Sequence, residues 1–240
     1  MQPDAGWDYS ARAYIAWIDR GAPERELLLD PVMLRLCGDV AGARVLDVGC
    51  GEGRFCRMMA SRGATAVGID PTAAMIRAAK GRDVGGACDY VRAAGERQPF
   101  ADATFDLVLS YVTLVDIEGY RDAIAEMARV LRPGGHLVVA NLSFVTASAG
   151  WFRDAEGNRL YHRVDRYLED RPITLVWSDM SITNWHRPLT AYMAAYLGAG
   201  LILRDFLEPA PDTDALRDDP YFEDWYRIPD FTVMRWQKPV

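Results

Sequence analysis

The spacing of hydrophobic residues divides the chain into regions of different period. Residues 6–38 carry aromatic and aliphatic side chains at helical intervals, interrupted at Gly21 and Pro23, and so predict two helices. Short apolar runs then alternate with helical patterns. The runs predicted as strands are 44–48, 66–69, 90–93, 105–110 and 136–141, and the helical patterns are 55–62, 73–80 and 120–131. This alternation predicts an α/β fold with a mostly parallel sheet, whose ligands bind beyond the carboxyl ends of the strands.

The alternation stops after residue 141. Residues 142–187 are rich in Trp, Tyr, Arg and Asp without a clean period, and we interpret them as an inserted cap of loops, short strands or helices. One more helical pattern and two β-like runs follow, over 189–197, 201–207 and 231–236. A length of 240 residues suits a single domain, with N-terminal helices within 1–38 and a substrate cap at 142–187.

The composition of the chain limits the kinds of partner and ligand that we expect. The formal net charge of −7 repels phosphate backbones, so we expect no nucleic acid partner. The four cysteines form no CxxC pair and there are three histidines, so we expect no metal site. No run approaches the roughly 18 apolar residues of a membrane span. We therefore expect a cytoplasmic monomer or homodimer that has reduced cysteines, binds no membrane and acts on a small molecule.

The most specific signal is a glycine-rich loop after the first predicted strand. The strand at 44–48 runs into Gly49, Gly51 and Gly53 and then into a helix. Glycine lets the backbone approach a ligand closely, because it has no side chain and tolerates positive φ. The alternative is a purely structural role, in which the glycines form a tight turn without a ligand.

Two acids accompany this loop. Asp47 lies in the strand end, and Asp70 closes the next strand, where a carboxylate can accept both hydroxyls of a ribose. Asp70 also suits a helix N-cap before Pro71, and Asp47 also suits pairing with an arginine. A dinucleotide site would need GxGxxG, but Arg54 occupies the third glycine position. Asp47 and Glu52 would repel a pyrophosphate, whereas they suit a ligand with ammonium and sulfonium charges.

These residues resemble motif I of the class I S-adenosylmethionine-dependent methyltransferases, and the resemblance covers residues 40–141. It implies a Rossmann-like, doubly wound, seven-stranded sheet with strand order 3-2-1-4-5-7-6, whose last strand is antiparallel. It also implies S-adenosyl-L-methionine as the cofactor and methyl transfer as the activity.

The resemblance further implies roles for individual residues. Gly49 and Gly51 would face the methionine portion, Asp47 would orient its ammonium group and Asp70 would hold the ribose. The family's usual aspartate contact to adenine falls on Ala94, so Glu96 or the backbone at Gly95 would replace it. The implied cofactor-binding set is Tyr14, Asp47, Gly49, Gly51, Gly53, Asp70, Pro71, Met75, Gly95, Glu96, Ser110 and Tyr111.

The acceptor side leaves a weaker signal. Relatives often carry a histidine where this chain has Val115, so we expect no base at that position. His186 is the candidate base, although a role in packing against Trp185 explains it equally well, and His162 is the weaker alternative. The predicted substrate residues are Trp151, Tyr161, Trp185 and His186. Their aromatic character favours an aromatic or heterocyclic acceptor.

Other functions stay open at this point. An RNA or protein methyltransferase would use the same cofactor motifs, but it should show a basic face or a docking groove. A non-catalytic protein could keep the glycine loop and lose the acceptor pocket. A nicotinamide-dependent oxidoreductase is disfavoured by the glycine spacing.

Overall fold

The computed structural model describes residues 6–211 and 220–240, so residues 1–5 of the predicted N-terminal region lie outside the described residues. The helical segments are α1 (Trp7–Ile18), the π-helical η1 (Glu24–Leu29), α2 (Asp30–Cys37), α3 (Arg54–Ala60), α4 (Ala73–Arg82), α5 (Tyr120–Val130), the 3-10 turn η2 (Phe144–Ala147), α6 (Leu189–Gly198), the 3-10 turn η3 (Pro220–Phe222) and α8 (Glu223–Arg227). The strands are β1 (Arg44–Val48), β2 (Thr65–Asp70), β3 (Cys88–Arg92), β4 (Phe105–Tyr111), β5 (Leu131–Leu142), β6 (Ser148–Arg153), β7 (Arg159–Val164), β8 (Arg171–Trp177), β9 (Met180–His186), β10 (Ile202–Leu207) and β11 (Phe231–Gln237).

The central sheet has the predicted topology. Its order is β10-β11-β5-β4-β1-β2-β3, and β11 runs antiparallel to both of its neighbours. With β10 and β11 as the sixth and seventh strands of the sheet, the order 3-2-1-4-5-7-6 is confirmed. β5 begins at Leu131, earlier than predicted, and residues 132–135 form an irregularity within this strand, opposite Asp106.

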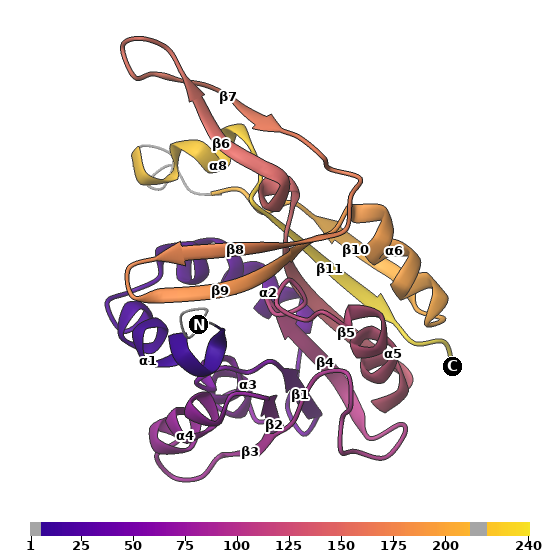
Figure 1. Ribbon diagram of the computed structural model, residues 1–240. Coiled ribbons are helices and arrows are strands. Elements are labelled where there is room, and N and C mark those ends of the chain that lie inside the picture. The colour runs from indigo at the N-terminus through magenta and orange to yellow at the C-terminus, as the bar shows by residue number, and fades with distance from the viewer. Residues whose placement is uncertain (1–5, 212–219) are drawn as a thin grey trace, which may run out of the picture.

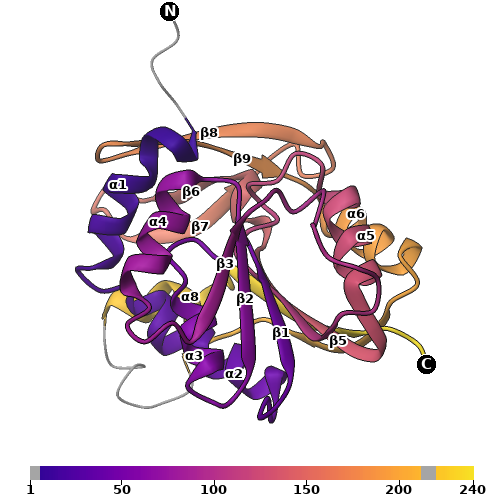
Figure 2. The ribbon, with the colours of Figure 1, turned by 90° about the horizontal axis from the view of Figure 1, so that it is seen from below.

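Helices cover both faces of the sheet, as the alternation predicts (Figure 2). On one face α2, α3 and α4 pack on the sheet, in a core that includes Met59 of α3 and Val45 of β1. On the other face α5 and α6 pack on the sheet, in a core that includes Met127 of α5 with Leu46 and Val48 of β1. Successive residues of β1 thus enter different cores, because side chains alternate along a strand. Both faces are buried, which leaves the ends of the strands for ligands.

The inserted region, residues 142–187, contains two antiparallel hairpins, β6–β7 and β8–β9. The β6–β7 hairpin projects from the body, whereas β8–β9 lies beside α1 (Figure 1). Gly6 N–H donates to the Ser181 carbonyl at 2.7 Å, and Ser10 Oγ donates to the same carbonyl at 3.0 Å. These bonds join the N-terminal helix to the cap. In residues 6–211 and 220–240, no helix is long and apolar enough to cross a membrane.

Candidate active site

A cavity of about 540 Å³ opens at the carboxyl ends of β1, β2 and β4. We call one side the glycine-loop wall, and it consists of Asp47, Gly49, Cys50, Gly51, Glu52, Asp70, Pro71, Thr72, Met75, Ala94, Gly95 and Glu96. We call the other side the cap wall, and it consists of Trp7, Leu142, Leu175, Trp177, Ile182, Asn184 and Phe231. Tyr111 at the end of β4 and the loop after it, residues 112–118, contribute to the cavity as well. One space thus joins a polar, acidic region to a mainly apolar one.

The glycines of the loop serve different purposes. A Cβ on Gly49 would overlap the side chain of Thr113, whose hydroxyl donates to the Gly49 carbonyl at 3.2 Å. Gly51 has a φ of 54° and no atom within 4 Å of its Cβ position, so its surface faces free space at the cavity wall. Gly53 does not line the cavity. Its Cβ position instead lies 2.7 Å from the Tyr90 ring, so this glycine allows the ring to pack closely. The structure therefore places Gly49 and Gly51 at the predicted site but assigns Gly53 to packing.

The Asp70 carboxylate links the first two strand-end loops. It accepts backbone hydrogen bonds from Gly51 at 3.1 Å and Thr72 at 2.8 Å. Burial raises its pKa, and these two donors oppose the shift. The Thr72 bond supports the chain just before α4, but the N-cap of that helix is Thr72 and not Asp70, so the helix-cap alternative for Asp70 was wrong. Each carboxylate oxygen can accept more than one bond, so the group can still accept hydroxyls from the cavity.

Asp47 is a buried carboxylate without a cation beside it. Its side chain is 2% exposed, and its Oδ2 accepts a thiol hydrogen bond from Cys56 at 3.5 Å. Its Oδ1 has no partner among the described residues, and no arginine there forms an ion pair with it. Burial raises the pKa of Asp47 to about 7. A carboxylate of this kind on a cavity wall suits an incoming ammonium group, which would satisfy the free oxygen.

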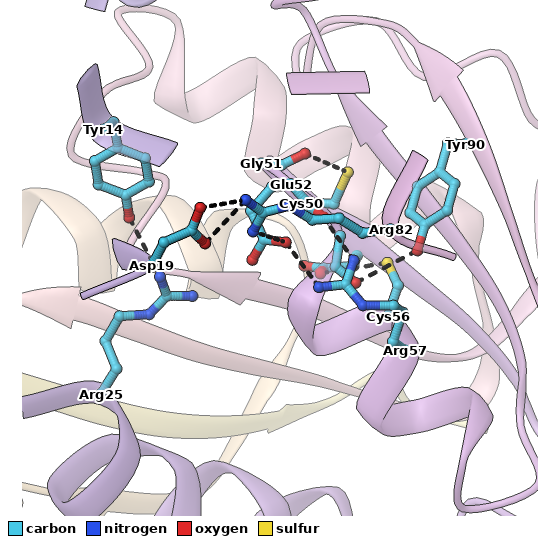
Figure 3. Close-up of polar contacts among 12 residues, drawn as sticks. Tyr14, Asp19, Arg25, Cys50, Gly51, Glu52, Cys56, Arg57, Arg82 and Tyr90 are labelled. Carbon is cyan, nitrogen blue, oxygen red and sulfur yellow. Dashed lines mark hydrogen bonds and ion pairs between the residues drawn. The ribbon is translucent and has the colours of Figure 1, made fainter. Parts of the chain in front are cut away.

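Glu52, in contrast, is already paired. Its carboxylate meets Arg57 at 2.7 Å and Arg82 at 3.2 Å, and Arg82 also binds Asp19 at 2.8 Å (Figure 3). This network connects the glycine loop, α4 and the end of α1. Because two guanidinium groups compensate Glu52, we correct the expectation that its charge faces a sulfonium.

The N-terminal helical region supplies a positive group to the cavity. Arg25 Nη1 donates to the Tyr14 hydroxyl at 3.4 Å (Figure 3). The Arg25 guanidinium also lies 5.4 Å from the Tyr111 ring centroid. Both Tyr14 and Arg25 line the cavity, and within residues 6–211 and 220–240 no carboxylate forms an ion pair with Arg25. Tyr14 was predicted here, whereas Arg25 was not. The pair fits a ligand carboxylate.

Further predicted cofactor residues lie partly on the wall. Pro71, Met75, Gly95 and Glu96 line the cavity. Tyr111 lines it too, while its hydroxyl donates to Asp30 at 2.9 Å.

Ser110 requires a correction, because it is fully buried and absent from the cavity wall. Neighbouring residues of β4 point to opposite faces of the sheet, so Ser110 and Tyr111 do not share one site.

The predicted substrate residues Trp151 and Tyr161 lie on the projecting hairpin and not on the cavity wall. Trp151 packs against His162 at 4.3 Å between ring centroids, and Tyr161 stacks on Phe152 at 5.0 Å. Tyr161 is 52% exposed. The structure corrects this assignment, because these rings pack within their own hairpin.

His186 is fully buried and does not line the cavity. Its Nδ1 lies 2.7 Å from the Thr146 hydroxyl, and its Nε2 lies 2.7 Å from the Tyr167 carbonyl. A carbonyl only accepts, so Nε2 carries the proton and Nδ1 accepts from Thr146. Burial lowers the pKa of His186. Because both ring nitrogens of His186 already have partners, we replace its predicted role as a base by a role in packing. Trp185, another predicted substrate residue, does not line the cavity either.

Arg187, the next residue, holds the loop after β4 in place. It donates to the carbonyls of Leu114 at 3.0 Å, Ile117 at 2.7 Å and Glu118 at 3.0 Å. Its side chain is 1% exposed, and its guanidinium lies 4.2 Å from the Tyr120 ring centroid. The segment predicted to supply a base thus supplies a structural cation.

We expect Arg187→Met to lower the free energy of unfolding by about 3 kcal/mol or more, since hydrogen bonds from a buried charged donor are worth about 1.5–3 kcal/mol each. Urea unfolding measures this change. Arg121→Met is the control, because Arg121 is exposed and lies over the same Tyr120 ring, so its loss should cost at most about 1 kcal/mol. Equal losses in the two variants would contradict the proposed anchoring.

Two groups on the acceptor side were not predicted from the sequence. Asp116, after β4, lines the cavity, and its Oδ1 accepts a hydrogen bond from Asn184 Nδ2 at 2.6 Å. Asn184 and Ile182 alternate with exposed or half-buried residues along β9, which is the signal that identifies its inner face. Trp177, the last residue of β8, lines the cavity as well.

Comparison with known proteins agrees with this geometry. Residues 46–139 match the family described as methyltransferase domain. The chain is 30% identical over 152 residues to a demethylmenaquinone methyltransferase from Tropheryma whipplei, covering 63% of this chain and 64% of that relative. The corresponding protein of Corynebacterium glutamicum is 34% identical over 145 residues, 60% of this chain and 61% of the relative. The chain therefore spans less than two thirds of the length of these curated relatives.

Among solved structures, an S-adenosylmethionine-dependent methyltransferase from Mesorhizobium loti superposes with a TM-score of 0.80 at 26% identity, over 91% of this chain and 99% of that one. Residues 46–139 thus match a methyltransferase domain, and the fold is similar to that of S-adenosylmethionine-dependent methyltransferases. S-adenosyl-L-methionine is the cofactor of this family.

The cavity fits that cofactor on observations independent of the family. Asp47 offers an unpartnered buried oxygen for the ammonium group, and Arg25 with Tyr14 offers a cation and a hydroxyl for the carboxylate. Gly51 leaves free space at the wall, and Asp70 offers acceptors for a ribose. The donor set therefore matches both ends of the molecule.

Proposed function

We propose that this chain transfers a methyl group from S-adenosyl-L-methionine to a small molecule that is aromatic or heterocyclic. The observation that carries the proposal is that the acidic glycine-loop wall and the apolar cap wall line the same cavity. S-adenosyl-L-methionine supplies an electrophilic methyl group when it is bound. The relatives named as demethylmenaquinone methyltransferases support an acceptor with a ring.

The chain's own residues then have distinct tasks. Asp47, Asp70 and the Arg25–Tyr14 pair orient the cofactor, and the β8–β9 hairpin with α1 shields the reacting centre from water. Methyl transfer is an in-line displacement, so alignment supplies much of the acceleration, up to about 7–11 kcal/mol. We also propose that the whole chain is one methyltransferase domain and that residues 142–187 form its acceptor cap.

Calorimetric titration with S-adenosylmethionine, S-adenosylhomocysteine and NADH tests the cofactor. We expect both adenosyl ligands to bind, and we expect Asp70→Ala to weaken them at least 100-fold. The reason is the loss of two hydrogen bonds to a charged acceptor, together about 3 kcal/mol, at about 1.4 kcal/mol for each tenfold change.

Asp89→Ala is the matched control, because Asp89 is an exposed acid on β3 away from the cavity. It should bind both ligands like the wild type. Circular dichroism establishes that Asp70→Ala stays folded, which matters because Asp70 also bonds two backbone amides. Binding of NADH alone would refute the proposed activity.

A further inference from the structure

Asp116 is an acid on the cavity wall that the proposed cofactor contacts leave unused. Its carboxylate accepts hydrogen bonds from the Asn184 amide at 2.6 Å and from the Trp7 indole. Both partners are neutral donors, and no lysine, arginine or histidine of the described chain forms an ion pair with Asp116. We call these three residues the Asp116 cluster. In this cluster, two neutral donors form hydrogen bonds with the Asp116 carboxylate but do not compensate its negative charge.

The cluster adjoins the apolar part of the cavity, where Trp177, Ile182 and Phe231 line the cap wall. Burial raises the pKa of Asp116 to about 7, the charge of Asp70 raises it further, and the two donors oppose the shift. Tyr14 on α1 is the other titratable group that interacts with Asp116. A carboxyl near neutrality can exchange a proton with a ligand at physiological pH.

The position of Asp116 is fixed by its supports. The Trp185 backbone N–H donates to the Val115 carbonyl at 2.6 Å, and Arg187 holds the carbonyls on either side of the acid. The loop after β4 is therefore clamped by the end of β9. Rigid support of this kind is what a group acting on a reacting atom needs.

We propose that Asp116 accepts the proton of the methyl acceptor, and that this acceptor carries a hydroxyl or an N–H group on a flat apolar body. This inference rests on the proposed methyl transfer. The acceptor oxygen or nitrogen uses an electron pair to form the bond to the incoming methyl group, the pair of the broken S–C bond stays on sulfur, and the acceptor's proton passes to a carboxylate oxygen of Asp116.

The cluster also defines what the site rejects. An acceptor with its own carboxylate would meet Asp116 as a like charge, and the cap wall holds no lysine or arginine to compensate it. Hydroxyl and N–H groups, in contrast, donate to the carboxylate. The site thus selects for a hydrogen-bond donor at the reacting atom.

Binding of naphthalene probes to protein saturated with S-adenosylhomocysteine tests the inference. We expect 2-naphthol and 2-naphthylamine to quench tryptophan fluorescence with at least tenfold tighter binding than 2-naphthoate. Asp116→Asn keeps the shape of the side chain and removes its charge, so the preference for 2-naphthol over 2-naphthoate should fall at least tenfold. Asp122→Asn, an exposed change on α5, is the control and should keep the preference.

Infrared difference spectra of wild type against Asp116→Asn give a readout beyond binding, because they isolate the titration of this carboxyl. Asn184→Leu removes a donor to the ionised form, so it should shift that titration to higher pH. An unchanged probe preference in Asp116→Asn, or an unchanged titration in Asn184→Leu, would overturn the inference. Retained S-adenosylhomocysteine binding in those variants would leave the proposed function intact, whereas its absence in the wild type would remove both.

Discussion

Gly51→Ala is expected to weaken S-adenosylmethionine binding at least 100-fold while the protein stays folded. Gly51 has no neighbouring atom within 4 Å of its Cβ position and lies on the cavity wall, so an added methyl group would occupy ligand space. Its φ of 54° costs an L-residue about 1–2 kcal/mol, which lowers stability without unfolding a typical domain. Calorimetry for binding and thermal unfolding for stability measure the two effects separately.

Gly86→Ala is the matched control for backbone strain. Gly86 has a φ of 66° and an equally open Cβ position, but it lies between α4 and β3 and away from the cavity. Both variants should lose similar stability, and Gly51→Ala alone should lose binding. Equal binding by both variants would show that the ligand does not approach the loop at Gly51.

Gly49→Ala should behave differently, because its Cβ would overlap the Thr113 side chain. We expect a loss of stability well above that of Gly51→Ala, with binding lost as a consequence of the distorted loop. Thr113→Ala in the same chain should restore part of the stability, since it removes the two closest atoms, Cγ2 and Oγ1, while Cβ at 2.8 Å and the strained φ remain. The two glycines of one motif are thus separable into a ligand contact and a packing contact.

The cofactor side of the site could be predicted from the sequence because local patterns place it. Asp47 is the residue before the last of β1, and Asp70 is the last residue of β2. Neighbouring parallel strands end at the same edge, and so these acids line one space. The errors on this side have local causes as well. Ser110 was placed on the wall although it precedes Tyr111 by one residue, and that shift turns a strand side chain to the other face.

The acceptor side could not be predicted, because long-range packing determines it. Which cap residues face the cavity depends on how β8–β9 docks on α1, through contacts such as that of Ser10 with Ser181, 171 positions apart. The raised pKa of Asp116 depends on burial, and one of its hydrogen-bond donors lies 68 positions away. Aromatic content alone directed attention to Trp151 and Tyr161, which pack within the projecting hairpin instead.

Cofactor binding is expected to weaken as the pH falls below about 7, because of Asp47. In the free protein burial raises the pKa of this carboxyl to about 7, while Cys56 and Arg25 oppose the shift and Asp70 and Glu52 add to it. An ammonium group beside the free Oδ1 favours the ionised form, so binding lowers that pKa. Below pH 7 the ligand must therefore displace a proton, and affinity should fall up to tenfold per pH unit, or about 50-fold from pH 7 to pH 5, because Asp47 is already half protonated at pH 7.

Titration of S-adenosylhomocysteine in buffers of different ionisation enthalpy measures the released proton directly. An α-amino group has a pKa of about 8, so the ligand stays protonated below pH 7 and the slope belongs to the protein. Asp47→Asn should bind weakly and with little pH dependence, whereas Asp116→Asn should keep the wild-type slope. If Asp47→Asn kept that slope, the linked proton would belong to another acid of the cavity, and Asp70, whose pKa is also raised, would become the group that senses the ligand's charge.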